Sequence, residues 1–210
     1  MIKNSIEQYF SNKKWNYESF LGCDGGNPKA SLWVMAIEWG GNMEDGLEKA
    51  QYNFGTDYPY RDEKCDIPKS WLTSAFDLKL VEFLHYYQDK NQTTISLDDK
   101  KEYLKNTLYN KNSPIFKLNL YPFPDNMVDG KWELPANKEW TNKVIKENKE
   151  EYYNEIIQSG RLAFLKKHFN DSKDSKILLV IGREIEYNIR IGFKNVYRYS
   201  IRLTQSSNLI

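Results

Sequence analysis

An acidic residue stands directly after one of the most apolar runs of the chain. Residues 32–37 are uninterruptedly apolar, and Glu38 follows them, before a Trp-Gly-Gly turn at residues 39–41. The run has the length of a strand buried on both faces, and ligands of open α/β sheets bind beyond the carboxyl ends of such strands. Glu38 therefore stands where a functional acid is expected. The alternative is that Glu38 caps a following helix and that the glycines only make the turn.

A second polar residue, Asn119, stands near the carboxyl end of the short apolar run at residues 115–121. Pro122 and Pro124 end this run. An asparagine amide has two donors and an acceptor, so Asn119 can read the edge of a pyrimidine or of adenine. Its alternative role is to tie down the loop that follows, residues 121–129.

Aromatic residues gather in the loop at residues 53–61, where Phe54, Tyr58 and Tyr60 stand beside a glycine. Such rings can stack on a flat ligand such as a base, or they can pack back into the core. The helical segment that follows carries His85, which we interpret as a satisfied packing histidine rather than a catalytic one.

The charge and hydropathy of the chain limit its partners. Its 210 residues include 30 basic and 29 acidic side chains, so a net charge of +1 creates no overall field toward nucleic acid or an anionic membrane. No apolar run approaches the roughly 20 residues of a spanning helix, and residues 1–5 lack the apolar core of a signal peptide. We expect one cytoplasmic domain, residues 1–210, with no membrane partner; the sequence specifies no oligomeric state.

The two cysteines, Cys23 and Cys65, are far apart and solitary. This excludes a Cys-x-x-Cys redox pair and an all-cysteine iron–sulfur cluster or structural zinc site within one chain. The glycines of residues 21–28 precede a strand instead of following one, which excludes a P-loop and predicts a plain loop there. We therefore expect free thiols, no metal and no organic cofactor.

Four short runs of the sequence predict strands, at residues 32–37, 115–121, 176–181 and 196–201. Apolar periodicity predicts helices between them, at residues 71–87, 97–109 and 152–169, the last belonging to a longer run from residue 138 with a break or kink at Gly160. Strands without alternation have no solvated face, so the fold class is α/β, a three-layer α/β/α sandwich with a mostly parallel sheet of about four strands. Glu38, Asn119 and Gly182 should then line one cleft.

Three segments together resemble the uracil-DNA glycosylase superfamily. The first is Ala-Ile-Glu-Trp-Gly at 36–40, where that superfamily ends its first core strand with a Gly-x-Asx-Pro-Gly type motif. The second is Leu-Asn-Leu-Tyr-Pro at 118–122, where the superfamily has a base-binding asparagine. The third is the segment 161–182, where an arginine-led helix feeds a strand that ends in glycine. The resemblance implies a uracil-DNA glycosylase-like fold. It also implies a DNA-repair hydrolase in which Glu38 positions or activates the attacking water and Asn119 reads the damaged or modified base.

The resemblance implies further substrate contacts, with DNA or another nucleobase-containing ligand as the partner. Phe54 would stack on the flipped base. The remaining implied contacts are turn and strand-end residues: Trp39, Gly40, Gly41, Tyr121 and Gly182. The implied hydrolysis requires neither a metal nor an organic cofactor.

The chain also departs from the pattern of this superfamily. Trp39 stands where proline is usual, and Glu38 is one methylene longer than the usual Asp or Asn. The superfamily has a His-Pro-Ser type loop after its last core strand, whereas this chain has no proline after Pro135 and no histidine after His168. A second hypothesis is therefore a non-catalytic nucleic-acid or nucleotide-binding module, and a third is a small-molecule hydrolase or transferase that uses the same crevice.

Overall fold

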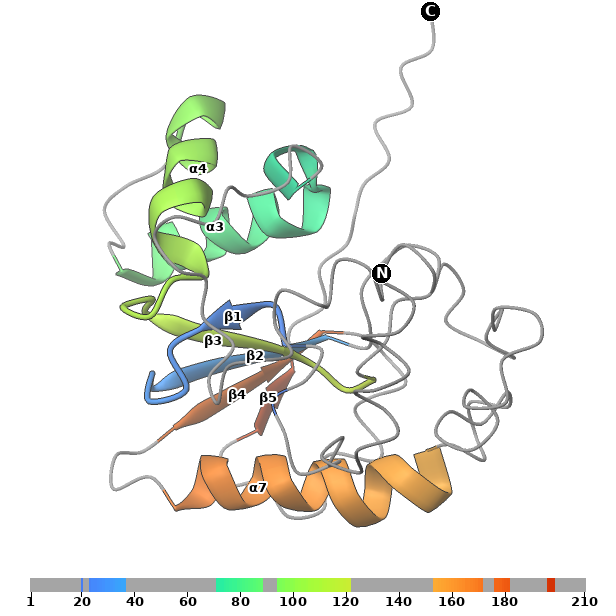
Figure 1. Ribbon diagram of the computed structural model, residues 1–210. Coiled ribbons are helices and arrows are strands. Elements are labelled where there is room, and N and C mark those ends of the chain that lie inside the picture. Colours follow the sequence, from blue (N-terminus) through green and yellow to red (C-terminus); the bar gives the residue numbers. More distant parts are fainter. Residues whose placement is uncertain are drawn as a thin grey trace, which may run out of the picture.

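The computed structural model describes residues 20, 23–36, 71–88, 94–121, 153–171, 176–181 and 196–198. Within these ranges the chain forms a five-stranded sheet with helices on both sides (Figure 1). The predicted α/β class is therefore confirmed. No helix in these ranges combines the length and the apolar character that crossing a membrane requires.

The sheet has one short antiparallel edge strand and four parallel strands in the order β1-β3-β2-β4-β5. Its strands are β1 (Gly25–Gly26), β2 (Leu32–Ala36), β3 (Ile115–Asn119), β4 (Ile177–Val180) and β5 (Val196–Arg198). Strand β2 pairs in parallel with β3 and β4, and β4 pairs in parallel with β5. The four predicted strands and their mostly parallel arrangement are confirmed, and β3 and β4 end somewhat earlier than expected.

The central strands β2 and β3 are buried along their whole length. Both lie inside the sheet, and helices cover both of its faces, so no position of either strand meets solvent. The uninterrupted apolar run of β2 in the sequence reflects this burial on both faces. Strand β3 nevertheless contains two polar residues, Lys117 and Asn119, and both are buried.

Two groups of helices lie on opposite sides of the sheet (Figure 1). The first comprises η2 (Trp71–Thr73), α3 (Ala75–Gln88), α4 (Leu97–Tyr103) and the π-helical turn η3 (Leu104–Leu108). The second comprises the π-helical η4 (Tyr153–Arg161) and α7 (Leu162–Asn170). Strand β3 lies on one side of β2 and β4 lies on its other side, so the chain reverses its direction across the sheet after β3. Because crossover connections between parallel strands are right-handed, the connection from β2 to β3 and the connection from β3 to β4 must cover opposite faces of the sheet.

A break or kink was expected at Gly160, and of these two the break is wrong. The helix continues through Gly160 and changes from π-helical to α-helical winding one residue later, between Arg161 and Leu162. Glycine lowers helix propensity, but it does not end a helix whose neighbouring residues are buried against a sheet. Single π-helical segments occur frequently at functional sites, and this one ends at the buried Arg161.

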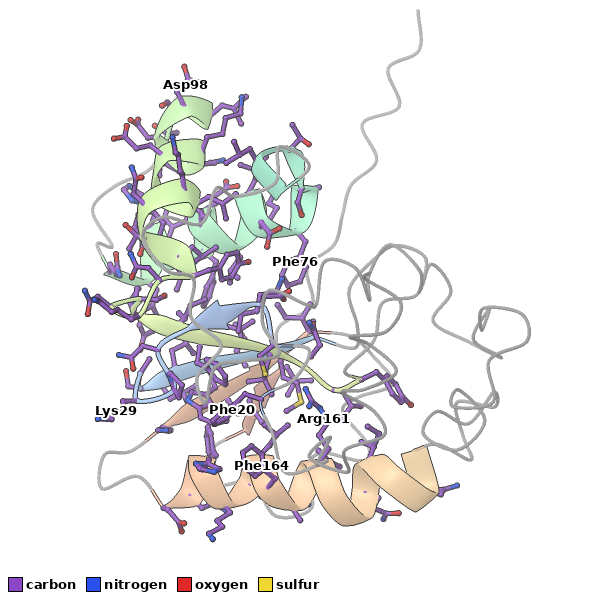
Figure 2. The ribbon with its side chains drawn as sticks, in the orientation of Figure 1. Phe20, Lys29, Phe76, Asp98, Arg161 and Phe164 are labelled. Carbon is purple, nitrogen blue, oxygen red and sulfur yellow. The ribbon has the colours of Figure 1, made fainter. Side chains whose placement is uncertain are left out.

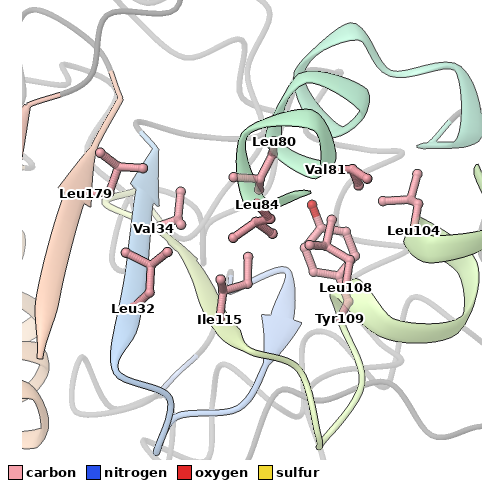
Figure 3. Close-up of a cluster of buried hydrophobic side chains, with 10 residues drawn as sticks. All are labelled: Leu32, Val34, Leu80, Val81, Leu84, Leu104, Leu108, Tyr109, Ile115 and Leu179. Carbon is pink, nitrogen blue, oxygen red and sulfur yellow. The ribbon is translucent and has the colours of Figure 1, made fainter. Parts of the chain in front are cut away.

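One core layer lies between the sheet and the first group of helices (Figure 3). Alternate residues of the strands, Leu32, Val34, Ile115 and Leu179, meet side chains of α3 and η3 there. Helix α3 is positioned by Ser74, whose Oγ accepts a hydrogen bond from the backbone N–H of Asp77 at 3.3 Å. This N-cap fixes where the helix begins, and Asp77 stands in its first turn, where a negative charge suits the helix dipole.

The opposite core layer consists mainly of aromatic rings. Trp33 of β2 lies between Phe116 and Phe169, with ring centroids 4.9 and 5.4 Å away in edge-to-face geometry. Phe20 extends the layer toward Phe164 of α7, at 5.0 Å. Aromatic pairs in this geometry add to the stability that burial alone provides, which explains why a chain rich in rings builds its core from them.

The plain loop expected at residues 21–28 is wrong in part, because Gly25 and Gly26 form β1 and pair with β3. Gly26 has a φ of +101°, and a Cβ atom on it would lie 2.3 Å from the carbonyl oxygen of Ile115. Only glycine permits this conformation and this approach of two backbones. A pair of glycines reads as a turn in the sequence, although here it serves as a close-packed edge strand.

Candidate functional site

A lysine lies in the middle of the buried strand β3. Lys117 shares its side of the strand with Ile115 and Asn119, because alternate residues of a strand point to the same face. That face is the one covered by α3, and Lys117 is 8% exposed. An ammonium group in such a place is stable only with anionic partners.

Two aspartates provide these partners. The Nζ of Lys117 lies 2.8 Å from Asp24 Oδ2 and 3.3 Å from Asp77 Oδ1. Asp24 immediately precedes β1, and its backbone N–H donates to the Lys117 carbonyl, while Asp77 comes from the capped start of α3. Both carboxylates are buried, at 6% and 5% exposure. The ion triad therefore joins an edge strand, a central strand and a helix.

Aromatic rings complete the surroundings of the ammonium group. Its Nζ lies 4.3 Å from the ring centroid of Phe76 and 5.5 Å from that of Tyr109, and the Tyr109 hydroxyl donates a hydrogen bond to Asp77. Burial alone would lower the pKa of Lys117, but Asp24 and Asp77 outweigh it and raise the pKa above its ordinary value. Lys117 therefore stays charged at neutral pH and is not a nucleophilic amine.

The buried network continues to Asn119 at the carboxyl end of β3. Its Nδ2 donates to Asp24 Oδ2 at 3.3 Å, so one carboxylate oxygen serves both Lys117 and Asn119. Asn119 is 1% exposed. Its backbone is in register with Ala36, the last residue of β2. The sequence offered a base-reading role and a loop-tying role for Asn119, and the structure adds a partner that neither named.

Arg161 holds the same strand end from the second group of helices. Its Nε and Nη2 both donate to the carbonyl oxygen of Asn119, at 3.3 and 2.7 Å, and Arg161 is 2% exposed. Figure 2 shows Arg161 between the sheet and α7, whereas Phe76 lies on the other side of the sheet. Asn119 is thus fixed through its side chain on one side and through its backbone on the other.

Cys23 lies against the same arginine, with Nη2 of Arg161 3.9 Å from Sγ. Burial raises the pKa of the Cys23 thiol to about 12, because the lowering effect of the Arg161 charge is smaller and Asp24 adds to the rise. A thiol that stays protonated is not a nucleophile. Cys23 is a free cysteine, as predicted, and the structure assigns it a packing position.

The chemistry available in this cluster is limited to binding and orientation. Its lysine is charged, its thiol is protonated, and the described part of the chain contains no group of three His, Cys, Asp or Glu side chains suited to a metal ion. What it offers is an amide held at the carboxyl end of a central parallel strand. This is the edge of an α/β sheet where ligands bind.

Of the predicted site residues, only Asn119 and Tyr121 lie in the described ranges. Tyr121 is partly exposed just beyond β3. The others lie outside the described residues: Glu38, Trp39, Gly40, Gly41, Phe54, Tyr58, Tyr60 and Gly182. His85 lies on α3. The prediction that its hydrogen-bonding groups are satisfied is wrong, since its buried Nε2 has no hydrogen-bond partner within the described ranges.

Sequence reasoning missed Asp24, Asp77 and Lys117 as members of one cluster. A signal was present, because Lys117 interrupts an otherwise apolar run with the length of a buried strand. A lysine in such a run requires a counter-ion, and this requirement could have been stated without a structure. The sequence alone could not show which of the 29 acidic residues is the counter-ion of Lys117.

Comparison with known proteins adds no relative to this description: no protein-family model, no curated protein and no solved structure matches the chain.

Proposed function

We propose that the chain is a DNA glycosylase-like protein of the uracil-DNA glycosylase-like three-layer fold. It would hydrolyse the N-glycosidic bond of a damaged or modified base at the carboxyl edge of the parallel sheet. The strand order supports this location, since β2, the first of the parallel strands, has the second and the third on its two sides. In doubly wound sheets the ligand crevice opens where the strand order reverses in this way.

The observation that carries the proposal is the register of Ala36 with Asn119 on adjacent parallel strands. Ala36 and Asn119, each of which belongs to a segment that carries the resemblance, therefore lie side by side at the carboxyl ends of neighbouring strands. Asn119 would read the edge of an extruded base, and Glu38, two residues after Ala36 in the sequence, would aim a water at C1′ of the sugar. Phe54 would stack on the base.

Base release from oligonucleotides tests the proposal. Purified protein should release free base from DNA that contains uracil or another lesion, and Glu38→Gln should reduce the rate at least about 100-fold, as expected for loss of a general base. Glu82→Gln is the matched control, because Glu82 is a partly exposed carboxylate of α3 that pairs with Lys79 of the same helix and with Lys100 of α4. A full lesion panel without product above a mock preparation would defeat the proposal.

A second candidate is a non-catalytic nucleic-acid or nucleotide-binding module on the same fold. The burial of Asn119 and its attachment to both Asp24 and Arg161 favour a residue that shapes a pocket over one that takes part in turnover. A salt titration of DNA binding, run beside the release assay, separates the candidates. Specific binding at moderate salt without base release supports the module, and turnover rejects it.

A further inference from the structure

One peptide group joins the three segments that carry the resemblance. The N–H of Leu120 donates to the carbonyl oxygen of Ala36 at 2.8 Å. The carbonyl oxygen at the other end of the same peptide group belongs to Asn119 and accepts from Nε and Nη2 of Arg161, at 3.3 and 2.7 Å. Ala36 lies in the first segment, the peptide group lies in the second, and Arg161 begins the third. The three segments therefore meet at one peptide group.

The guanidinium of Arg161 supplies donors where the pairing of β3 with β1 has ended. The two ends of a trans peptide group point in opposite directions, so the Asn119 carbonyl points away from β2. On that side β1 pairs with β3 through only two residues, and the backbone N–H of Cys23, just before β1, donates to the Phe20 carbonyl instead. Buried carbonyls require donors, and here two come from one planar side chain that is itself 2% exposed.

We propose that Arg161 is a positioning residue for the proposed hydrolysis, because it fixes the peptide group that holds the carboxyl ends of β2 and β3 together. This inference rests on the proposed function in one respect, that the site lies at these strand ends. Arg161 acts through the Asn119 carbonyl and the Leu120 N–H on the end of β2, where Ala36 stands two residues before Glu38 in the sequence. Groups that support a site in this way set the rate, because a small displacement of a reacting group costs much of the acceleration.

Single-turnover base release tests this role, with the protein in saturating excess over an oligonucleotide that carries the base released by the wild type. The rate then reports the steps after binding and is insensitive to a small unfolded fraction. Arg161→Met lacks the two donors and should release the base at least about tenfold more slowly than the wild type. Phe169→Leu is the matched control on α7, since it loses the ring contact with Trp33, at 5.4 Å, and leaves the peptide group alone. Its rate should stay within about twofold of the wild type. Equal rates for Arg161→Met and the wild type, or an equal loss in both variants, would overturn the proposal.

Nuclear magnetic resonance of the unliganded protein separates a failure of this inference from a failure of the proposed function. In the wild type, the Nε proton of Arg161 should exchange with solvent far more slowly than that of free arginine, because it is buried and donates to Asn119. The backbone N–H of Leu120 should exchange faster in Arg161→Met than in the wild type, and at the wild-type rate in Phe169→Leu.

Rapid exchange of the Arg161 Nε proton in the wild type needs no variant that must fold, and it refutes the positioning role even if base is released. An unchanged Leu120 exchange rate in Arg161→Met refutes the role as well. If the wild type releases no base while both exchange signatures are present, the proposed function fails and the role of Arg161 in holding the two strand ends stands.

Discussion

Lys117 Nζ and Asp24 Oδ2 lie 2.8 Å apart in a region that is almost closed to solvent. The pair joins the central strand β3 to the segment that precedes β1, an edge strand of only two residues. Two residues of backbone pairing cannot hold an edge strand by themselves, so the buried ion pair and the Asn119 hydrogen bond attach this segment to the sheet. Removing either charge leaves the other one buried without its partner.

Lys117→Met should therefore destabilise the fold by about 3–5 kcal/mol, the usual cost of breaking a buried ion pair. The variant leaves Asp24 and Asp77 close together without the intervening cation, and this repulsion adds to the loss. Urea unfolding at pH 7 measures the free energy of unfolding. Lys79→Met is the control, because Lys79 pairs with Glu82 on an exposed surface and should cost less than about 1 kcal/mol. Equal costs for the two variants would show that the triad contributes no more than a surface pair.

The acidity of Cys23 predicts how stability changes at alkaline pH. Burial raises the pKa of this thiol to about 12 from 9.0, so the unfolded chain loses the proton first and stability falls as the pH rises through this window. Between pH 8 and pH 10 the unfolding free energy of the wild type should fall by about 1.4 kcal/mol more than that of Cys23→Ala. The cavity left by the alanine is the same at both pH values and cancels in this comparison.

Chemical unfolding of both proteins at pH 8, 9 and 10 checks this prediction. Native Cys23 should also resist alkylation at pH 8, because a protonated and buried thiol presents no nucleophile. A wild type and a Cys23→Ala variant with the same alkaline slope would mean that the thiol is ionised as easily in the folded chain as in the unfolded one.

The parallel strands could be predicted from the sequence because their apolar runs carry the information locally. Strand β2 is an uninterrupted apolar run, and its five positions are all buried. Strand β1 could not be predicted, because two glycines have no hydrophobic pattern and read as a turn. Its position depends instead on the close approach of Gly26 to the backbone of β3.

The candidate site was predicted only in part, and the reason is the distance along the chain. Asn119 could be singled out from its position at a strand end, but its partner Asp24 lies 95 residues away in the sequence. Lys117 and Asp77 are 40 residues apart. No local pattern states which acid faces which cation, since the sheet register and the start of α3 decide it.

Gly26→Ala tests the account of β1. The added Cβ would lie 2.3 Å from the carbonyl oxygen of Ile115, and the φ of +101° is one that alanine rarely adopts. Backbone strain of this kind costs on the order of 1–3 kcal/mol, before the clash is counted. The free energy of unfolding should fall by at least that amount, whereas Ser31→Ala, at an exposed neighbouring position, should leave it within about 0.5 kcal/mol. An alanine variant as stable as the wild type would remove the steric reason for the glycine.

Arg161 provides the last test, because it anchors the strand end that carries Asn119. Arg161→Met removes both hydrogen bonds to the Asn119 carbonyl and should cost about 1–3 kcal/mol. Arg161→Lys keeps the charge but loses the planar pair of donors, so it should recover only part of the loss. Hydrogen exchange gives the local measure: the backbone N–H of Leu120, which donates to the Ala36 carbonyl, should exchange faster in both variants as the ends of β2 and β3 separate. Lys167→Met, an exposed change on α7, should leave that exchange rate unaltered. If Arg161→Lys matched the wild type in both stability and exchange, the charge of Arg161 rather than its paired donors would hold Asn119.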